Sequence, residues 1–451
     1  MDWNSLLNTH RLGKKPAKQE LGRSPFNSDH DKIIFSSAFR RLGKKTQVHP
    51  MATNDHIHNR LTHSLEVACV GRSLGIRVGH ALMEKHRLPP GFLPTDIGDI
   101  VQSACLAHDI GNPPFGHTGE EAIRNWFAQD GQPYLTGLTA EEQADLLNFE
   151  GNAQGLRVLT TSEYHPYAGG MRLTYATLGA FIKYPWTAAP ANHGLRPKPK
   201  YGVFQAELAI FEEIALAVGL PQLGEHWYSR HPLVYLMEAA DDFCYGILDL
   251  EDGLAMEILS WEEIFAILQP VLESTKMPEV YSELEQAAPK RKPEIIRGQI
   301  ISAYIDAAAQ AFMQHEDELF QGIPADLIGL CPELIRHSVH SAKETAKHKI
   351  FAHPRKIEVE IGAYYVISTL LEVMCAAVEQ WVSHPKDISF KSKRVIDLIG
   401  ANSFDPRITA TDSRHSPKYL ALMRVLDFIS GMTDHYATYM AKQFNGMGDS
   451  R

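Results

Sequence analysis

Cysteine is scarce in this sequence, and long apolar runs are missing. The 451 residues include five widely separated cysteines and no Cys-x-x-Cys pair, which excludes a disulfide framework of the secreted type and indicates buried thiols. No apolar run approaches the roughly 20 residues that span a bilayer, and the polar, basic N-terminus lacks the apolar core of a secretion signal. These absences predict a cytoplasmic protein without membrane segments. The cysteines are Cys69, Cys105, Cys244, Cys331 and Cys375.

An excess of positive charge is also absent. With 44 Lys and Arg against 54 Asp and Glu, the formal net charge is -10, which argues against a protein that coats nucleic acid and must neutralise phosphates. A local basic pocket is compatible with this charge. We find no Walker A motif, no His-Glu-x-x-His, no dinucleotide fingerprint, no internal repeat and no Ser/Gly-rich linker. A hydrophobic content of 44% is enough for a large core.

The pair His108 and Asp109 stands at the end of an apolar helical pattern over 96–106. Gly111, Pro113 and Pro114 then end the helix. An imidazole and a carboxylate that neighbour each other at a buried helix end can both face one divalent cation. Two ligands are too few for a site, so further ligands must come from elsewhere in the chain.

Other segments give weaker signals. Ser28 and Asp31 predict a helix start, with an apolar face that ends near Gly43, and the basic cluster 40–45 is either solvated surface or an anion contact. A long helix is expected from about residue 59 towards Met83, carrying His63, after a loop with His49, His56 and His58. Loops are expected over 128–145 and 190–200, a buried hydrogen-bonding segment over 148–157, and helices over 173–182, 363–382 and 419–440.

His117 and Glu120 flank the start of a helix predicted over 118–127, where Thr118 and Glu121 have capping-box spacing. A separation of three positions places both side chains on one helical face, so the carboxylate can orient the imidazole for proton transfer or for positioning a water. The alternative is a capping carboxylate beside a surface histidine.

Acidic residues interrupt an apolar helix predicted over 233–250. Asp241, Tyr245 and Asp249 stand at i, i+4 and i+8, which places them on one stripe. Buried carboxylates are costly unless they are paired or bound to a metal. This stripe is the second strong indication of a site.

Taken together, these residues resemble the HD-domain metal-dependent phosphohydrolases, and among them the bacterial deoxyguanosine triphosphate triphosphohydrolases and their relatives. His63, His108, Asp109 and Asp241 reproduce the order H, HD, D. The resemblance covers most of the chain, and Asn112 departs from it because some relatives carry histidine there. Its most specific pieces are the segments 38–42, 45–48, 60–67, 108–117, 148–152 and 238–242.

The resemblance implies a role for each matching residue. His63, His108, Asp109 and Asp241 would hold a divalent metal, which the sequence leaves open as Mg, Mn, Ni or Zn. We prefer Asp241 to Asp242 because it shares a helical face with Tyr245 and Asp249, where the family's sugar-contacting residues lie. The resemblance further implies His117 and Glu120 as the catalytic pair, Gln47 near the 3′-hydroxyl, and Arg60 and Lys183 as phosphate contacts.

The reaction implied by the resemblance cleaves a deoxynucleoside triphosphate, dGTP or a broader dNTP set, into deoxynucleoside and inorganic triphosphate. Tyr245 stacked on the sugar would leave little room for a 2′-hydroxyl. Two alternatives stay open: an HD phosphohydrolase for nucleoside monophosphates or cyclic nucleotides, and a regulatory module that binds nucleotides or single-stranded nucleic acid.

The expected fold is all-α, with a basic arm over 1–29, an HD helical core over 30–255 and a helical C-terminal lobe over 256–451. The resemblance implies a homo-oligomer, commonly a hexamer, and leaves open an allosteric nucleotide site.

Overall fold

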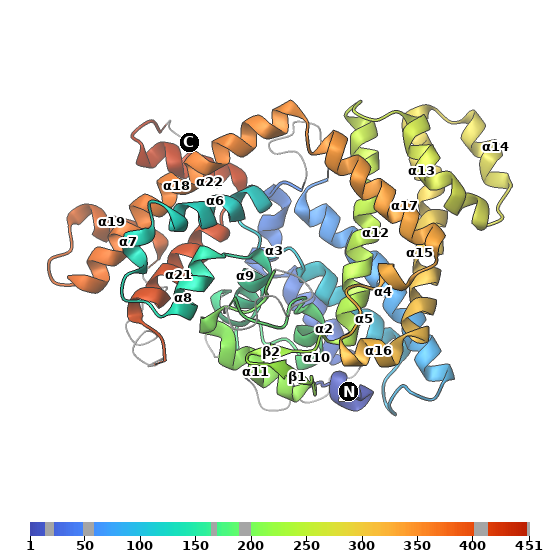
Figure 1. The fold of residues 1–451 in the computed structure, drawn as a ribbon, viewed down its shortest axis with the longest axis horizontal. Helices are drawn as coiled ribbons and strands as arrows, with labels where there is room; N and C mark the ends of the chain where they lie inside the picture. The colour runs from blue at the N-terminus through green and yellow to red at the C-terminus, as the bar shows by residue number, and fades with distance from the viewer. Residues whose placement is uncertain (14–21, 48–57, 164–168, 189–199, 401–413, 449–451) are drawn as a thin grey trace.

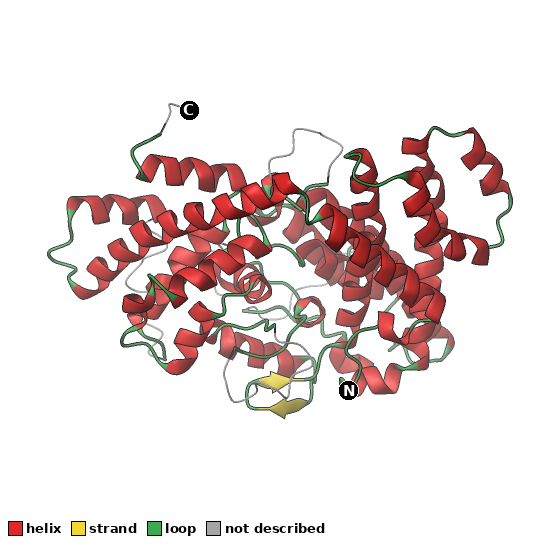
Figure 2. Ribbon diagram, turned by 45° about the horizontal axis from the view of Figure 1, so that its top comes forward, coloured by secondary structure: helices red, strands yellow, loops and turns green. Residues whose placement is uncertain are grey.

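Helices make up most of the chain in the computed structural model, which describes residues 1–13, 22–47, 58–163, 169–188, 200–400 and 414–448. Figure 2 shows the helices and, at the margin, the one small sheet of the described residues, in which β1 (Gln222–Gly224) pairs antiparallel with β2 (Trp227–Tyr228). The all-α prediction is therefore confirmed. The first helices are α1 (Trp3–Leu6), α2 (Pro25–Ile34), α3 (Ser37–Arg41), α4 (Arg60–Glu84), α5 (Pro94–Ala107), α6 (His117–Ala128), α7 (Gln132–Leu135), α8 (Ala140–Leu147), α9 (Gly151–Arg157), α10 (Tyr175–Phe181), α11 (Leu208–Ala217) and α12 (Pro232–Ala255).

The remaining helices follow α12 in the chain. They are α13 (Trp261–Ser274), α14 (Glu279–Gln286), α15 (Lys292–Gln314), α16 (Glu316–Gln321), α17 (Glu333–Thr345), α18 (Pro354–Ser383), α19 (Phe390–Ile399), α21 (Pro417–Ser430) and α22 (Asp434–Phe444). Five-residue π-helical turns follow α9 and α17, namely η2 (Val158–Ser162) and η7 (Ala346–Ile350).

Helices α4, α5 and α12 pack against one another (Figure 1), and they carry His63, the C-cap residue His108 and Asp241, respectively. Glycines on α4 let α5 approach to backbone contact. A Cβ at Gly75 would lie 2.9 Å from Cα of Gly98, and a Cβ at Gly79 would lie 2.7 Å from Cα of Pro94. Because no side chain separates the two helices there, α4 and the end of α5 bring His63 and His108 together.

The helix predicted from Ser28 to near Gly43 was wrong at its start and at its end. α2 begins at Pro25, and its cap is Ser24, whose hydroxyl accepts from the Asn27 N–H. The single helix expected up to Gly43 breaks after Ile34, because Ser36 donates to the Ile33 carbonyl and caps α3 by accepting from the Phe39 N–H. Such local side-chain bonds compete with continuation of a helix.

The start of α6 also differs from the prediction. It begins at His117 with Gly116 as its cap, and the expected capping box at Thr118 is not formed. Glu121 accepts from Arg124 on the next turn instead. The loop predicted over 128–145 contains α7 and α8, and the latter is capped by Thr139 with Glu142 in a capping box. The segment 419–440 is divided between α21 and α22 by a turn at Gly431.

Helix α18 corrects the expectation that no run is long and apolar enough to span a bilayer. Its part from Lys356 to Ser383 meets that condition by length and composition. In this structure it packs against α6, α19, α21 and α22, and its apolar residues, among them Leu370, Met374 and Val378, are buried in the second of two hydrophobic clusters. The first cluster draws its residues from Trp3 to Ile350.

Four of the five cysteines are buried as expected, while Cys69 on α4 is exposed. The basic residues Lys14, Lys15 and Lys18, the histidines His49 and His56, and the loop residues 190–199 lie outside the described residues. The division into domains at 29/30 and 255/256 stays a prediction.

Candidate active site

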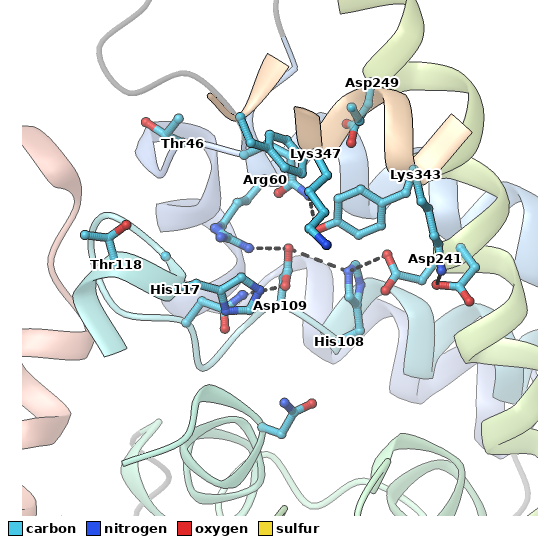
Figure 3. Close-up of a pocket in the computed structure, with 18 of the residues that line it drawn as sticks. Thr46, Arg60, His108, Asp109, His117, Thr118, Asp241, Asp249, Lys343 and Lys347 are labelled. Atoms are coloured by element: carbon cyan, nitrogen blue, oxygen red, sulfur yellow. Dashed lines mark hydrogen bonds and ion pairs between the residues drawn. The ribbon is translucent and has the colours of Figure 1, made fainter. Parts of the chain in front are cut away.

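Three helices supply a cluster of two histidines and two aspartates. His63 Nε2 lies 3.1 Å from Oδ1 of Asp241, and His108 Nε2 lies 3.5 Å from the same oxygen and 3.6 Å from Oδ2 of Asp109. Candidate ligand atoms of His63, His108 and Asp109 all lie within 4.8 Å of one another. α4, the end of α5 and α12 therefore bring the four proposed ligands together. Figure 3 shows three of them, His108, Asp109 and Asp241.

The histidine protonation pattern fits a metal site. The Nδ1 atom of His108 lies 2.6 Å from the Cys105 carbonyl oxygen and donates to it, so the lone pair is on Nε2. That Nε2 atom is buried and has no hydrogen-bond partner among the described residues. A buried imidazole nitrogen without a partner, beside two carboxylates, fits a divalent cation bound by nitrogen and oxygen donors.

Neighbouring side chains stabilise the charged form of both carboxyls in this cluster. Burial opposes ionisation of Asp109, but the Arg60 guanidinium and then His108 hold the pKa of this carboxyl well below its usual range. Arg60 Nη1 donates to Asp109 Oδ2 at 2.6 Å. Burial likewise opposes ionisation of Asp241, and His108 and His63 lower its pKa. Both carboxylates are therefore held in the anionic form that a metal ligand needs.

The two adjacent aspartates on α12 have different surroundings. Asp241 faces the histidines, whereas Asp242 pairs with Lys343 of α17, with Nζ 2.6 Å from Oδ1. Both line one cavity of about 570 Å³, a volume typical of small-molecule sites. Tyr245 and Asp249 line the same cavity, so the stripe predicted on this helix does face a single space.

His117 and Glu120 form a hydrogen-bonded pair beside the cluster. His117 Nδ1 donates to Glu120 Oε2 at 2.9 Å, and the other oxygen of Glu120 accepts from the Gly151 N–H at 2.8 Å. Glu120 is buried, and although burial raises the pKa of this carboxyl, its hydrogen bond to His117 lowers it overall. The His117 side chain is 70% exposed and lines the cavity. A buried carboxylate thus orients an imidazole whose Nε2 is available to a ligand.

Gln47 and Tyr245 both line the cavity and are joined by a hydrogen bond. Gln47 Nε2 donates to the Tyr245 hydroxyl at 2.8 Å, and Gln47 Oε1 is buried with no partner in the part of the chain that the structure describes. The Tyr245 ring packs against His63, with centroids 5.0 Å apart. Burial and then the Asp252 carboxylate raise the pKa of Asp249 well above its usual range, which favours the neutral acid that can donate as well as accept.

Cationic side chains surround the same cavity. Lys183 Nζ lies 3.5 Å from Glu238 Oε1. Burial lowers the pKa of this amine, but the Glu238 carboxylate raises it above its usual value overall. Sequence reasoning missed the cations contributed by Lys343 of α17 and Lys347 of η7, which Figure 3 shows, and by Lys356 of α18. Nothing local distinguishes Lys343 and Lys347 from a solvated face, because their position depends on how α17 and η7 pack on α12. Lys200, Arg60, Asn112 and Asn152 also line the cavity.

Comparison with known proteins agrees with this geometry. A family model described as the HD domain matches residues 60–169, a stretch that contains His63, His108, Asp109 and the His117/Glu120 pair. Together with the helical fold and the clustered ligands, this match defines the class: the protein is an HD-domain phosphohydrolase. Asp241 lies beyond the matched residues.

The full chain resembles named relatives. A deoxyguanosinetriphosphate triphosphohydrolase-like protein of Pseudomonas aeruginosa is 52% identical over 451 residues, which is 99% of each chain. One from Synechocystis is 37% identical over 99% of this chain and 100% of its own. The deoxyguanosinetriphosphate triphosphohydrolase of Klebsiella pneumoniae is 30% identical over 97% of both chains. The chain belongs to this family of deoxyguanosinetriphosphate triphosphohydrolases and triphosphohydrolase-like proteins, which confirms the resemblance seen in the sequence.

Proposed function

We propose that this protein hydrolyses deoxynucleoside triphosphates, dGTP or a broader dNTP set, to deoxynucleoside and inorganic triphosphate. The observation that carries the proposal is the cavity of about 570 Å³, which is lined both by three of the four proposed ligands, His108, Asp109 and Asp241, and by several lysines. A triphosphate brings several negative charges, and the lysines that line the cavity, some of them paired with carboxylates, support binding of such a ligand in a protein whose net charge is -10. The relative from Klebsiella pneumoniae carries the name of this activity.

His63, His108, Asp109 and Asp241 would hold the divalent metal, which when bound supplies Lewis-acid polarisation of a phosphoryl oxygen. The chain's own groups do the rest. Lys183, with the lysines of α17 and η7, binds the outer phosphates through charge-assisted hydrogen bonds. His117, held by Glu120, positions a water or exchanges its proton at Nε2.

The opposite side of the cavity suits a deoxyribose. Gln47 offers to a sugar hydroxyl its Oε1, which is buried and has no partner among the described residues, and Asp249 can donate or accept there. The Tyr245 ring, fixed by its contact with His63 and by Gln47, would lie against the sugar and leave little space for a 2′-hydroxyl. This supports a preference for dNTPs over rNTPs.

Product analysis tests the proposal. The purified protein is incubated with each dNTP and rNTP in the presence of Mg, Mn, Ni or Zn, and nucleoside, nucleotide, triphosphate and pyrophosphate are resolved. Deoxynucleoside and triphosphate in equal amounts are the expected products. Nucleoside monophosphates and cyclic nucleotides are tested in parallel. Orthophosphate released from the monophosphates, or nucleoside monophosphate formed from the cyclic nucleotides, without dNTP hydrolysis would favour the other HD phosphohydrolase reaction, and tight binding without turnover would favour a regulatory module.

We also propose that the protein is cytoplasmic and forms a homo-oligomer. Light scattering after size exclusion chromatography would measure its oligomeric state.

A further inference from the structure

The loop between Asp109 and His117 is held from the C-terminal end of the chain. Asp434, the first residue of α22, is buried, and its Oδ1 accepts a hydrogen bond from the Phe115 N–H at 2.9 Å. Its Oδ2 accepts from the Thr46 N–H at 3.0 Å and also from the Thr46 hydroxyl. One carboxylate therefore joins two segments that are remote from it in sequence and meet only in the folded protein.

Both segments lead directly to proposed site residues. Thr46 precedes Gln47, and Phe115 stands two positions before His117. Phe115 has a φ of 64°, a left-handed conformation that is unfavourable for a bulky residue unless its surroundings hold it. The next residue, Gly116, has a φ of 58°, and a Cβ there would lie 2.4 Å from Arg60 Nη2. The turn that begins α6 is thus strained, and the bond to Asp434 stabilises it.

A second connection supports the same loop. The buried amine of Lys45 donates to the Asn112 carbonyl at 2.6 Å and to the Ser430 carbonyl at 2.5 Å. Ser430 ends α21, so both ends of the loop 112–115 are attached to the junction between α21 and α22. Figure 1 shows these C-terminal helices, in red, on the side of the molecule that also holds α6.

We propose that Asp434 is a positioning residue for hydrolysis: it fixes the backbone at Phe115 and Thr46 so that His117 and Gln47 face the same substrate. This inference rests on the proposed function. Its hydrogen-bond partners, Thr46 and Phe115, are not proposed metal ligands. Asp434 thus acts on kcat through the orientation of His117 and on KM through the position of Gln47, and it leaves metal binding unchanged.

Kinetics with a matched control test this role. Asp427 is the control, because it also joins the C-terminal helices to the core, through Arg157 and Gln154 of α9, without touching the loop. Asp434→Ala should lower kcat by about 100-fold, the loss typical of a small misplacement of reacting groups, with metal content unchanged. Asp427→Ala should reduce thermal stability while the folded protein keeps a kcat near wild type. Thr46→Val, which removes one donor only, should give a smaller loss of kcat.

Combination with His117→Ala separates positioning from general destabilisation. If Asp434 acts through His117, then Asp434→Ala should cost less than roughly threefold in the His117→Ala background. An equal loss of kcat in both backgrounds, or no loss in the wild-type background, would overturn the proposal.

Hydrogen exchange provides a readout that needs no substrate. In Asp434→Ala the amides of the peptide that contains Phe115 and Gly116 should exchange faster, whereas in Asp427→Ala they should not. Unchanged exchange in Asp434→Ala would overturn the positioning role whatever the enzyme hydrolyses. Absence of dNTP hydrolysis by the wild-type protein, with faster exchange in Asp434→Ala, would reject the proposed function and retain the support of the loop by Asp434.

Discussion

His63 Nε2 lies 3.1 Å from Asp241 Oδ1, although 178 positions separate the two residues in the chain. His63 stands in the first turn of α4 and Asp241 in the middle of α12. Packing of α4 and α12, and not proximity in the sequence, therefore brings His63 and Asp241 together. Close packing of α4 on α5 at Gly75 and Gly79 is part of what brings the ligands together.

Substitutions of the two adjacent aspartates should distinguish the loss of a proposed metal ligand from the loss of a negative charge. Asp241→Asn, like His108→Ala or Asp109→Ala, should abolish metal retention and hydrolysis together, because each removes one of four ligands. Asp242→Asn removes the same charge one position away, where the partner is Lys343, and should keep the metal. Metal content after dialysis is the measurement, and full occupancy in Asp241→Asn would reject the ligand assignment.

The cations around the cavity predict a charge effect that depends on position. Lys347 lines the cavity, whereas Lys349, on the same π-helical turn, pairs with Glu263 away from it. Lys347→Gln should raise KM for a dNTP roughly fivefold, which corresponds to about 1 kcal/mol for one exposed charge-assisted contact. Lys349→Gln should leave KM unchanged. Equal effects of both substitutions, measured at two salt concentrations, would point to the overall field and not to a phosphate contact.

Asp249 should act on the sugar and not on the metal, because it lies two helical turns beyond Asp241. Asp249→Ala is expected to raise KM for dNTPs roughly tenfold, the loss expected for one or two hydrogen bonds, with metal content unchanged. Glu251→Ala on the same helix is the control, since Glu251 pairs with Arg297. Unchanged KM in Asp249→Ala would remove the stripe on α12 from substrate recognition.

A buried carboxyl away from the cavity predicts pH-dependent stability. Burial raises the pKa of Asp145 to about 8, although it accepts hydrogen bonds from Tyr419 and the Gln205 N–H. Between the unfolded pKa of about 4 and about 8, the folded protein binds the extra proton. The contribution of Asp145 to the stability should therefore fall as pH rises through this window, by at most about 1.4 kcal/mol per pH unit.

The measurement for Asp145 is urea unfolding from pH 5 to 9. Asp145→Asn should show a flatter dependence than wild type, whereas the exposed Asp130→Asn should follow wild type. A parallel slope in Asp145→Asn would show that other groups cause the dependence.

Sequence periodicity predicted α5 and α12, whose apolar residues recur at helical spacing. The resemblance to the HD phosphohydrolases gave the candidate ligands His63, His108, Asp109 and Asp241, whose side chains the structure brings together. The order of these residue types along the chain is enough to propose them as ligands, and it can be read without knowing how the helices pack.

Features that depend on packing between distant segments could not be predicted in this way. Lys343 and Lys347 look like the solvated face of an amphipathic helix until α17 is placed on α12. The start of α6 was predicted one residue late because a left-handed Gly116, held beside Arg60, replaces the expected side-chain cap. Asp434 gave no signal at all, since its partners Thr46 and Phe115 lie more than 300 positions away.

The His117/Glu120 pair gives the last prediction. The Glu120 carboxylate accepts from His117 Nδ1–H and so leaves a lone pair on Nε2 towards the cavity. In Glu120→Gln the amide oxygen can still accept from the Gly151 N–H, but the amide NH₂ then faces Nδ1 and moves the imidazole proton to Nε2. This variant keeps the shape and removes the basic nitrogen, so kcat should fall nearly as far as in His117→Ala, by roughly 10²–10⁴-fold.

Metal content and KM should stay near wild type, because neither residue is a proposed ligand. If Glu120 only orients His117, the double variant should be little slower than His117→Ala alone. Turnover near wild type in Glu120→Gln, with metal present, would exclude a role for the His117 tautomer and leave water activation to the metal cluster.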